Sequence, residues 1–292
     1  MSNINKVPAS AGAEWLLGAF ALIRKAPLSL GLLGVIWGLL STLAVQVMAL
    51  NVTFGLFMQL ALALLGPLLF AGMLWAVREV DEGRAAQPSH LFHSLRSDYA
   101  PSLLATLLPQ LAAALVLGVL LVVMIGPAEL QHLAEVVAKL QETAQTGGQP
   151  DPALVQALPV GRLFLWMLML FAAVIVMSLL TFVAVPDIVF GGNGGITAMR
   201  NSFRACVQNL LAMLVFYVLL FIALFALSIG IQMLAMVVQL VAGPTVGMWV
   251  SNLLLMAVLM PLMAGAVFYA WRQMLGGGAK STTSAAQAHL EA

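Results

Sequence analysis

Six long apolar stretches constrain the fold of this chain more than any other feature of its sequence. The hydrocarbon core of a bilayer is about 30 Å thick, and roughly 20 helical residues cross it. Only helices and closed barrels satisfy their own backbone polar groups there, and these runs lack the short alternating pattern of barrel strands. We therefore predict six membrane-spanning helices, at about residues 28–50, 54–77, 102–125, 163–185, 210–238 and 248–271.

The composition supports the same class. Hydrophobic residues make up 62% of the chain and charged residues only 8%, whereas about a quarter of a soluble domain is charged. Little chain remains for anything else. We predict a single polytopic membrane domain over residues 1–276, followed by a disordered cytoplasmic tail at residues 277–292.

Orientation follows from the cationic residues, because short cytoplasmic loops retain Lys and Arg. Only Lys139 and Arg162 fall on one side of the predicted spans, and the other ten of the twelve Lys and Arg residues fall on the opposite side. We expect both termini on the cytoplasmic side of a bacterial inner membrane. The net charge of +1 gives no indication of a nucleic-acid partner.

A short amphipathic segment precedes the first, third and fifth predicted spans. Each has an apolar residue followed at i+3 by a small residue and at i+4 by a bulky one, which lie on one stripe of a helix. We expect three interfacial helices whose stripes enter the headgroup boundary. The predicted fold is thus all-α, with three pseudo-repeats of an interfacial helix plus a membrane hairpin. The three stripes are Leu16, Ala19 and Phe20, then Leu91, Ser94 and Leu95, then Met199, Ser202 and Phe203.

Basic residues on these segments predict contact with membrane lipids. A Lys or Arg near an anionic leaflet contributes about 1 kcal/mol to binding. The expected headgroup contacts are Arg24, Lys25, Arg96, Arg200 and Arg204.

One sizeable segment is predicted outside the cytoplasm, at residues 127–161. Leu130, Leu133, Val137 and Leu140 mark one helical face. Packing over the outer mouth of the bundle is one interpretation, and docking of an envelope protein partner is the other. The oligomeric state is left open.

No catalytic, cofactor-binding or metal-binding motif occurs in the sequence, and we expect no enzyme activity and no cofactor. His90 and His93 are three residues apart, which fits the polar face of a surface helix or a metal site, and we favour the first. Asp187 is expected at the cytoplasmic boundary, solvated or paired with Arg200, in preference to a site of ion coupling.

Two glycine patterns also carry predictions. Gly31, Gly34 and Gly38 form a small face on the first span that lets helices approach closely, either within the chain or between subunits, and we favour internal packing. The run 191–195 is predicted to be a flexible joint.

Several phrases of the sequence resemble a known group of proteins. They are residues 12–15 with Phe20, residues 24–27, residues 66–72 and residues 198–209, in which residues 202–205 are the most telling. With them the chain resembles an uncharacterised proteobacterial family of roughly six-span inner-membrane proteins, distantly similar to the membrane domain fused to some glycerophosphodiester phosphodiesterases. The resemblance implies a membrane fold without the hydrolase domain.

Two functions agree with these patterns. The first is a non-enzymatic inner-membrane protein that organises lipid or scaffolds other envelope proteins. The alternative is a transporter or channel for a lipid or a small neutral solute.

Overall fold

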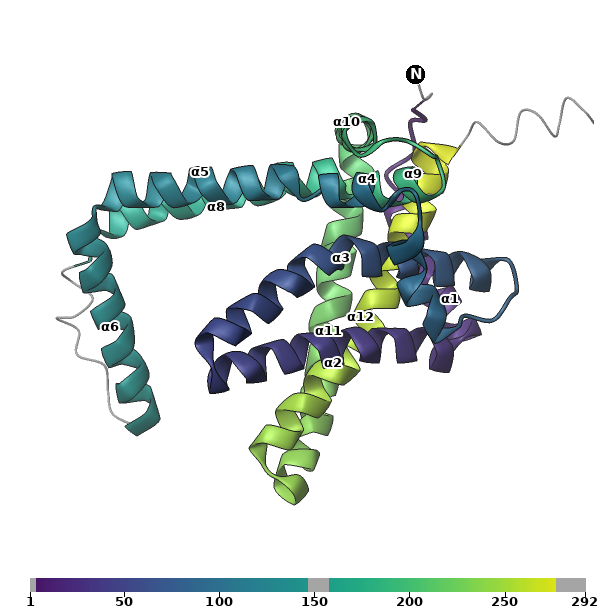
Figure 1. Cartoon of the computed structure of the whole chain (residues 1–292). Helices are drawn as coiled ribbons and strands as arrows, with labels where there is room; N and C mark the ends of the chain where they lie inside the picture. The colour runs from purple at the N-terminus through teal and green to yellow at the C-terminus, as the bar shows by residue number, and fades with distance from the viewer. Residues whose placement is uncertain (1–3, 147–157, 277–292) are drawn as a thin grey trace, which may run out of the picture. The chain divides into compact units, whose positions relative to one another are not determined.

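The computed structural model describes residues 4–146 and 158–276, and every regular element within them is a helix (Figure 1). The chain forms two compact units. One holds the described residues up to Leu107 and from Leu179 onward, and the other is Leu108–Ser178. The elements are α1 (Ala11–Lys25), α2 (Pro27–Leu50), α3 (Val52–Asp81), the 3₁₀ helix η1 (Pro88–Arg96), α4 (Ala100–Ala105), α5 (Leu108–Ile125), α6 (Pro127–Thr146), α8 (Val160–Thr181), α9 (Ala184–Val189), α10 (Gly195–Gln208), α11 (Leu210–Ala242) and α12 (Pro244–Met274).

Six helical stretches of the described chain are long and apolar enough to cross a membrane, which confirms the predicted fold class. Four are the single helices α2, α3, α11 and α12. The third stretch combines α4 with α5 and the fourth combines α8 with α9. The arrangement as three pseudo-repeats stays a prediction.

The fourth stretch is interrupted because of Pro186. A proline has no N–H to donate, and its ring clashes with the carbonyl four residues earlier, here that of Phe182. Accordingly α8 ends at Thr181 and α9 begins at Ala184. Ser202 of α10 compensates for the lost backbone pairing: its hydroxyl accepts from the Val183 N–H at 3.1 Å and donates to the Leu179 carbonyl at 2.9 Å.

Helix α12 is the centre of the larger unit and packs against α1, α2, α3 and α11. Helix α1 is part of this core. Its Trp15 is 0% exposed and lies near the rings of Phe182 and Phe216. A Cβ at Gly265 of α12 would lie 2.9 Å from the Ala19 Cβ, so the two helices meet at small residues.

Burial of the three predicted stripes therefore differs from our expectation. In each stripe the first two residues are buried against protein: Leu16 and Ala19, Leu91 and Ser94, and Met199 and Ser202. These side chains are not free to enter lipid, because neighbouring helices cover them. Of the third positions, Leu95 and Phe203 are exposed and Phe20 is half-buried. The location of α1, η1 and α10 in the membrane interface stays a prediction.

The glycine face of α2 packs within the chain, as predicted. A Cβ at Gly34 would overlap the Met256 carbonyl oxygen of α12, and one at Gly38 would lie 3.1 Å from the Met256 Cβ. Close backbone approach also brings polar groups together: the Asn252 amide donates to the Thr42 hydroxyl at 2.6 Å. Small residues and an interhelical hydrogen bond are what stabilise helix pairs in lipid.

The N-terminal strap, residues 4–10, joins the two ends of the described chain. The Asn5 backbone N–H donates to the Met274 carbonyl at 2.9 Å. The Val7 N–H donates to the side-chain oxygen of Asn209 at 2.8 Å, and the Asn209 amide donates back to the Asn5 carbonyl at 3.1 Å. The first residues are thus held at the end of the last helix.

The smaller unit contains α5, α6 and most of α8, and α5 and α8 run side by side in Figure 1. The Trp166 indole donates to the Leu117 carbonyl at 3.0 Å across this pair. Helix α6 confirms the helix expected within 127–161, but Val136, at 2% exposed, is buried in place of Val137, at 46%. Residues 147–157 of that segment and the predicted tail at 277–292 lie outside the described residues.

Candidate lipid-facing site

The five cations predicted to contact lipid are all exposed and lie on three elements. Two belong to the last turn of α1, one ends η1 and two lie on α10. Within the part of the chain that the structure describes, none of them forms a salt bridge with a carboxylate. Their positive charges are therefore available to an anionic ligand. They are Arg24, Lys25, Arg96, Arg200 and Arg204.

Three other cations are occupied by internal partners. Arg78 binds Glu82 at 2.7 Å, and its guanidinium lies 5.1 Å from the centre of the Trp75 ring. Arg272 binds Asp81 at 2.8 Å, which connects the ends of α3 and α12. Hydrogen bonds, first from Arg78 and then from Arg84, hold the pKa of Glu82 below its usual value. These cations stabilise the fold and offer little free charge.

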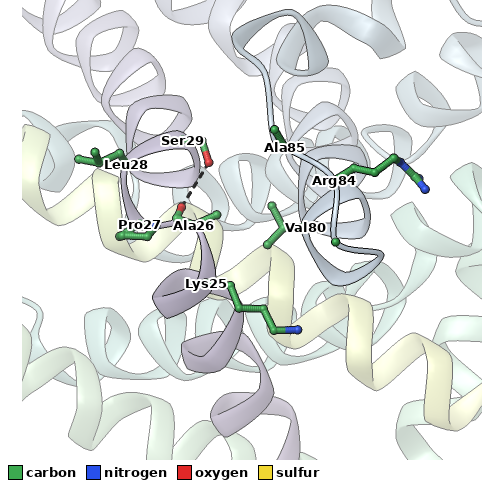
Figure 2. A pocket seen from close by; sticks show the side chains of 9 residues that line it. Lys25, Ala26, Pro27, Leu28, Ser29, Val80, Arg84 and Ala85 are labelled. Carbon is green, nitrogen blue, oxygen red and sulfur yellow. Dashed lines mark hydrogen bonds between the residues drawn. The ribbon is translucent and has the colours of Figure 1, made fainter.

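A groove lies where the α1–α2 junction faces the end of α3 and the loop after it (Figure 2). Its volume is about 620 Å³. We call it the Lys25 groove. Its lining residues are Lys25, Ala26, Pro27, Leu28, Ser29, Val80, Gly83, Arg84 and Ala85.

The two cations of the Lys25 groove differ in their surroundings. Arg84 donates to Glu79 at 2.7 Å and to Glu82, and these hydrogen bonds, that to Glu79 first, raise the pKa of Arg84. Two carboxylates therefore offset the charges of Arg84 and Arg78. Lys25 has no carboxylate partner among the described residues and supplies the unneutralised charge of the groove.

The rim of the same groove is apolar. Leu28 is 86% exposed and Pro27 is also exposed, and both belong to the first turn of α2. Helix α2 is the first candidate membrane span. The Lys25 groove thus places a free cation beside the end of an apolar span, an arrangement that suits an amphiphile with an anionic head and an apolar chain.

A second groove, of about 550 Å³, is formed by η1. Arg96 and His93 line it together with the exposed Phe92. His93 also lies edge-on to the Trp75 ring, with the ring centres 5.1 Å apart. His90 accepts a hydrogen bond from the Gln87 backbone N–H at 3.2 Å. Among the described residues no group of three His, Cys, Asp or Glu side chains could hold a metal ion.

The surroundings of Asp187 differ from those predicted. It is 3% exposed and accepts hydrogen bonds from Asn201 at 2.9 Å, Asn193 at 3.1 Å and the Trp271 indole at 3.3 Å. The expectation of a solvated or Arg200-paired carboxylate is therefore wrong. The break before α9 brings this residue against α10 and α12, where neutral donors satisfy it.

The glycine run after α9 forms a tight turn around Asp187. The Asn193 backbone N–H donates to the Asp187 carbonyl at 3.3 Å, and Gly192 has a φ of +68°. A Cβ at Gly191 would lie 2.6 Å from the Asp187 carbonyl oxygen, so only glycine fits there. The run predicted to be a flexible joint forms a turn in which Asn193 donates to both the backbone carbonyl and the side-chain carboxylate of Asp187.

Cys206 on α10 is buried and close to Ser202. Burial raises the pKa of the Cys206 thiol to about 12, although a hydrogen bond with Ser202 opposes the shift. A thiol with so high a pKa is a poor nucleophile at neutral pH. Cys206 therefore acts as a small packing residue.

Sequence reasoning found the free cations but missed two features of the site. It did not identify the Lys25 groove, because the groove needs Val80 and Arg84 to meet the α1–α2 junction. It also missed the partners of Asp187. The only sequence signal for these was the glycine run itself, whose glycines allow a chain to turn closely around a buried group.

Comparison with known proteins places the chain in a family without adding an activity. No curated protein and no solved structure is detectably similar to it. One family profile, described as a domain of unknown function, matches residues 16–274. This range begins within α1 and ends at the last residue of α12, so it contains all six candidate spans. Because the match covers far more than half of the chain, the protein belongs to the family of the domain of unknown function DUF7847.

Proposed function

We propose that this protein is a non-enzymatic component of a bacterial inner membrane that binds phospholipid headgroups and so organises lipid around its six spans. The observation that carries the proposal is that five exposed cations without carboxylate partners in the described chain lie on α1, η1 and α10 of the larger unit. The cations that do have such partners are Arg78, Arg84 and Arg272.

The position of these cations supports binding to a surface. α10 exposes Arg200 and Arg204 on one face, while Ala198, Ser202 and Ala205 are buried on the other. The exposed Phe203 and Val207 of the same helix add apolar contact area. Basic and apolar side chains on the exposed surface of a helix favour the boundary of an anionic leaflet.

The proposed orientation puts this face and both termini in the cytoplasm, following the distribution of Lys and Arg along the sequence. It agrees with the hydrogen bond between Asn5 and Met274, which holds both ends of the described chain together.

The test is the amount of anionic phospholipid that the purified protein retains. The full chain is extracted in a mild detergent, and native mass spectrometry measures its bound phosphatidylglycerol. The double variant Arg200→Gln with Arg204→Gln is expected to lose about tenfold or more in affinity, since each basic residue near the surface contributes about 1 kcal/mol.

The matched control removes two positive charges from the smaller unit, by Lys139→Gln with Arg162→Gln. It should leave retention within about twofold of the natural protein. Equal losses in both double variants would show that only net charge matters, and the proposed binding face would then be abandoned. The same protein in proteoliposomes tests the alternative function: flux of a lipid or small neutral solute, lost on unfolding, would favour a transporter.

A further inference from the structure

We propose that the Lys25 groove binds one phospholipid, with its phosphodiester against Lys25 and Arg84 and an acyl chain along Leu28. This inference rests on the proposed function and assigns it a specific site. The groove is formed by α1, α2 and the end of α3 with its following loop, all within the larger unit.

The charge of the groove matches one phosphodiester. Glu79 and Glu82 already offset Arg84 and Arg78, so Lys25 leaves a single free positive charge. A phosphodiester carries a single negative charge, whereas a free phosphate monoester carries close to two at neutral pH. Lys25 contributes the charge and three rotatable donors.

Arg84 supplies hydrogen-bond donors in a fixed orientation. Its Nε and one terminal nitrogen donate to Glu79 and Glu82, while its other terminal nitrogen, Nη1, donates to no acceptor in the described chain. The two carboxylates hold the guanidinium plane, and the remaining N–H groups are free to donate to a phosphate oxygen. In Figure 2 Val80 lies between the α1–α2 junction and the loop that carries Arg84.

The apolar rim favours a lipid over a soluble phosphate. Leu28 and Pro27 are exposed at the start of a candidate span and supply no hydrogen-bond donor side chain to a small anion. They do offer contact to an acyl chain, and each CH₂ group buried there adds to the affinity. We therefore commit to a two-chain phospholipid as the occupant.

The experiment titrates the detergent-purified full chain with phosphatidylglycerol and follows occupancy of the tightest site by native mass spectrometry. Lys25→Gln should weaken that site about fivefold. The matched control is Lys6→Gln, which removes the same charge from an exposed residue outside the groove. It should change occupancy by less than about twofold. Leu28→Gln should also weaken binding of the two-chain lipid.

Two results would overturn the groove assignment. One is an equal effect of Lys25→Gln and Lys6→Gln, and the other is displacement of the lipid by millimolar glycerol 3-phosphate, which would indicate a site for a soluble anion. If the wild-type protein retains lipid and loses it only in the Arg200 and Arg204 double variant, the groove is wrong and the proposed function stands. A wild-type protein that retains no phospholipid refutes both.

Discussion

The burial of Trp15 allows a sharp test of whether α1 belongs to the core. Its indole is fully buried, donates to the Gln273 side chain at 2.8 Å, and has the Phe182 and Phe216 rings about 6 Å away. If Trp15 instead faced lipid headgroups, it would contribute little to the stability of the folded bundle. The variants Trp15→Ala and Trp15→Phe separate these cases.

The expected magnitude follows from the contacts that are lost. A buried Trp covers about 150–250 Å², which corresponds to ~4–6 kcal/mol at ~25 cal/mol per Å². Measured Trp or Phe to Ala changes cost about 3–5 kcal/mol. We use the lower end, about 3 kcal/mol, because helices unfolded in a micelle remain in apolar surroundings. Trp15→Phe keeps a ring and loses one hydrogen bond, so it should cost about 1 kcal/mol.

The assay is reversible unfolding in mixed micelles of a mild detergent and dodecyl sulfate, followed by far-ultraviolet circular dichroism. Leu17→Ala is the control on the same helix, because Leu17 is exposed and should lie within about 0.5 kcal/mol of the natural protein. The free energy of unfolding should be highest for Leu17→Ala, lower for Trp15→Phe and lowest for Trp15→Ala. A Trp15→Ala variant as stable as Leu17→Ala would refute the burial of α1 in the core.

Three further substitutions and labels test other parts of the fold. Gly34→Val should disrupt packing of α2 on α12 and lower the melting temperature in detergent. Gly66→Ala should be tolerated, because a Cβ at Gly66 meets nothing within 4 Å. Equal effects of the two substitutions on the melting temperature would argue against the close helix pair. Asp187→Asn puts an amide donor among three donors and should cost about 1–3 kcal/mol of unfolding free energy, and an unchanged value would count against the three hydrogen bonds. At pH 8 a Cys206 thiol with a pKa of about 12 is roughly 0.01% thiolate, so a maleimide reagent should label it only after denaturation; rapid labelling of the native protein would contradict its burial.

The parts of the fold that depend on local pattern were predictable from sequence. Span length and apolar content identify six helices, and the small face of Gly34 and Gly38 anticipates a close helix pair because glycine lets backbones approach. The helix within residues 127–161 was also predictable. Its buried face was misassigned by one residue, since positions three and four apart both fall near the same stripe at 3.6 residues per turn.

The parts that depend on which elements meet could not be read from any single segment. The stripe with Leu16 and Ala19 is the same pattern whether lipid or α12 covers it, and the sequence does not say which. Asp187 was predicted to be solvated or paired with Arg200, because its actual partners Asn201 and Trp271 come from other helices. The free cations were predictable because charge is a property of the residue. The Lys25 groove was not, because its walls come from separate parts of the chain.

The pairing of α1 with α11 and α12 has a consequence for the biogenesis of this protein. Trp15 and Gln273, which hydrogen-bond in the finished structure, are 258 residues apart in the chain. At 5 to 20 residues per second a ribosome needs roughly 13 to 50 s to make that length. During this interval the first helix has been synthesised but its partners have not, so its apolar face needs a temporary host, such as the bilayer surface or an insertion factor. The amphipathic pattern of α1 is well suited to such a waiting state, and final closure of the bundle would come only with the synthesis of its last helix.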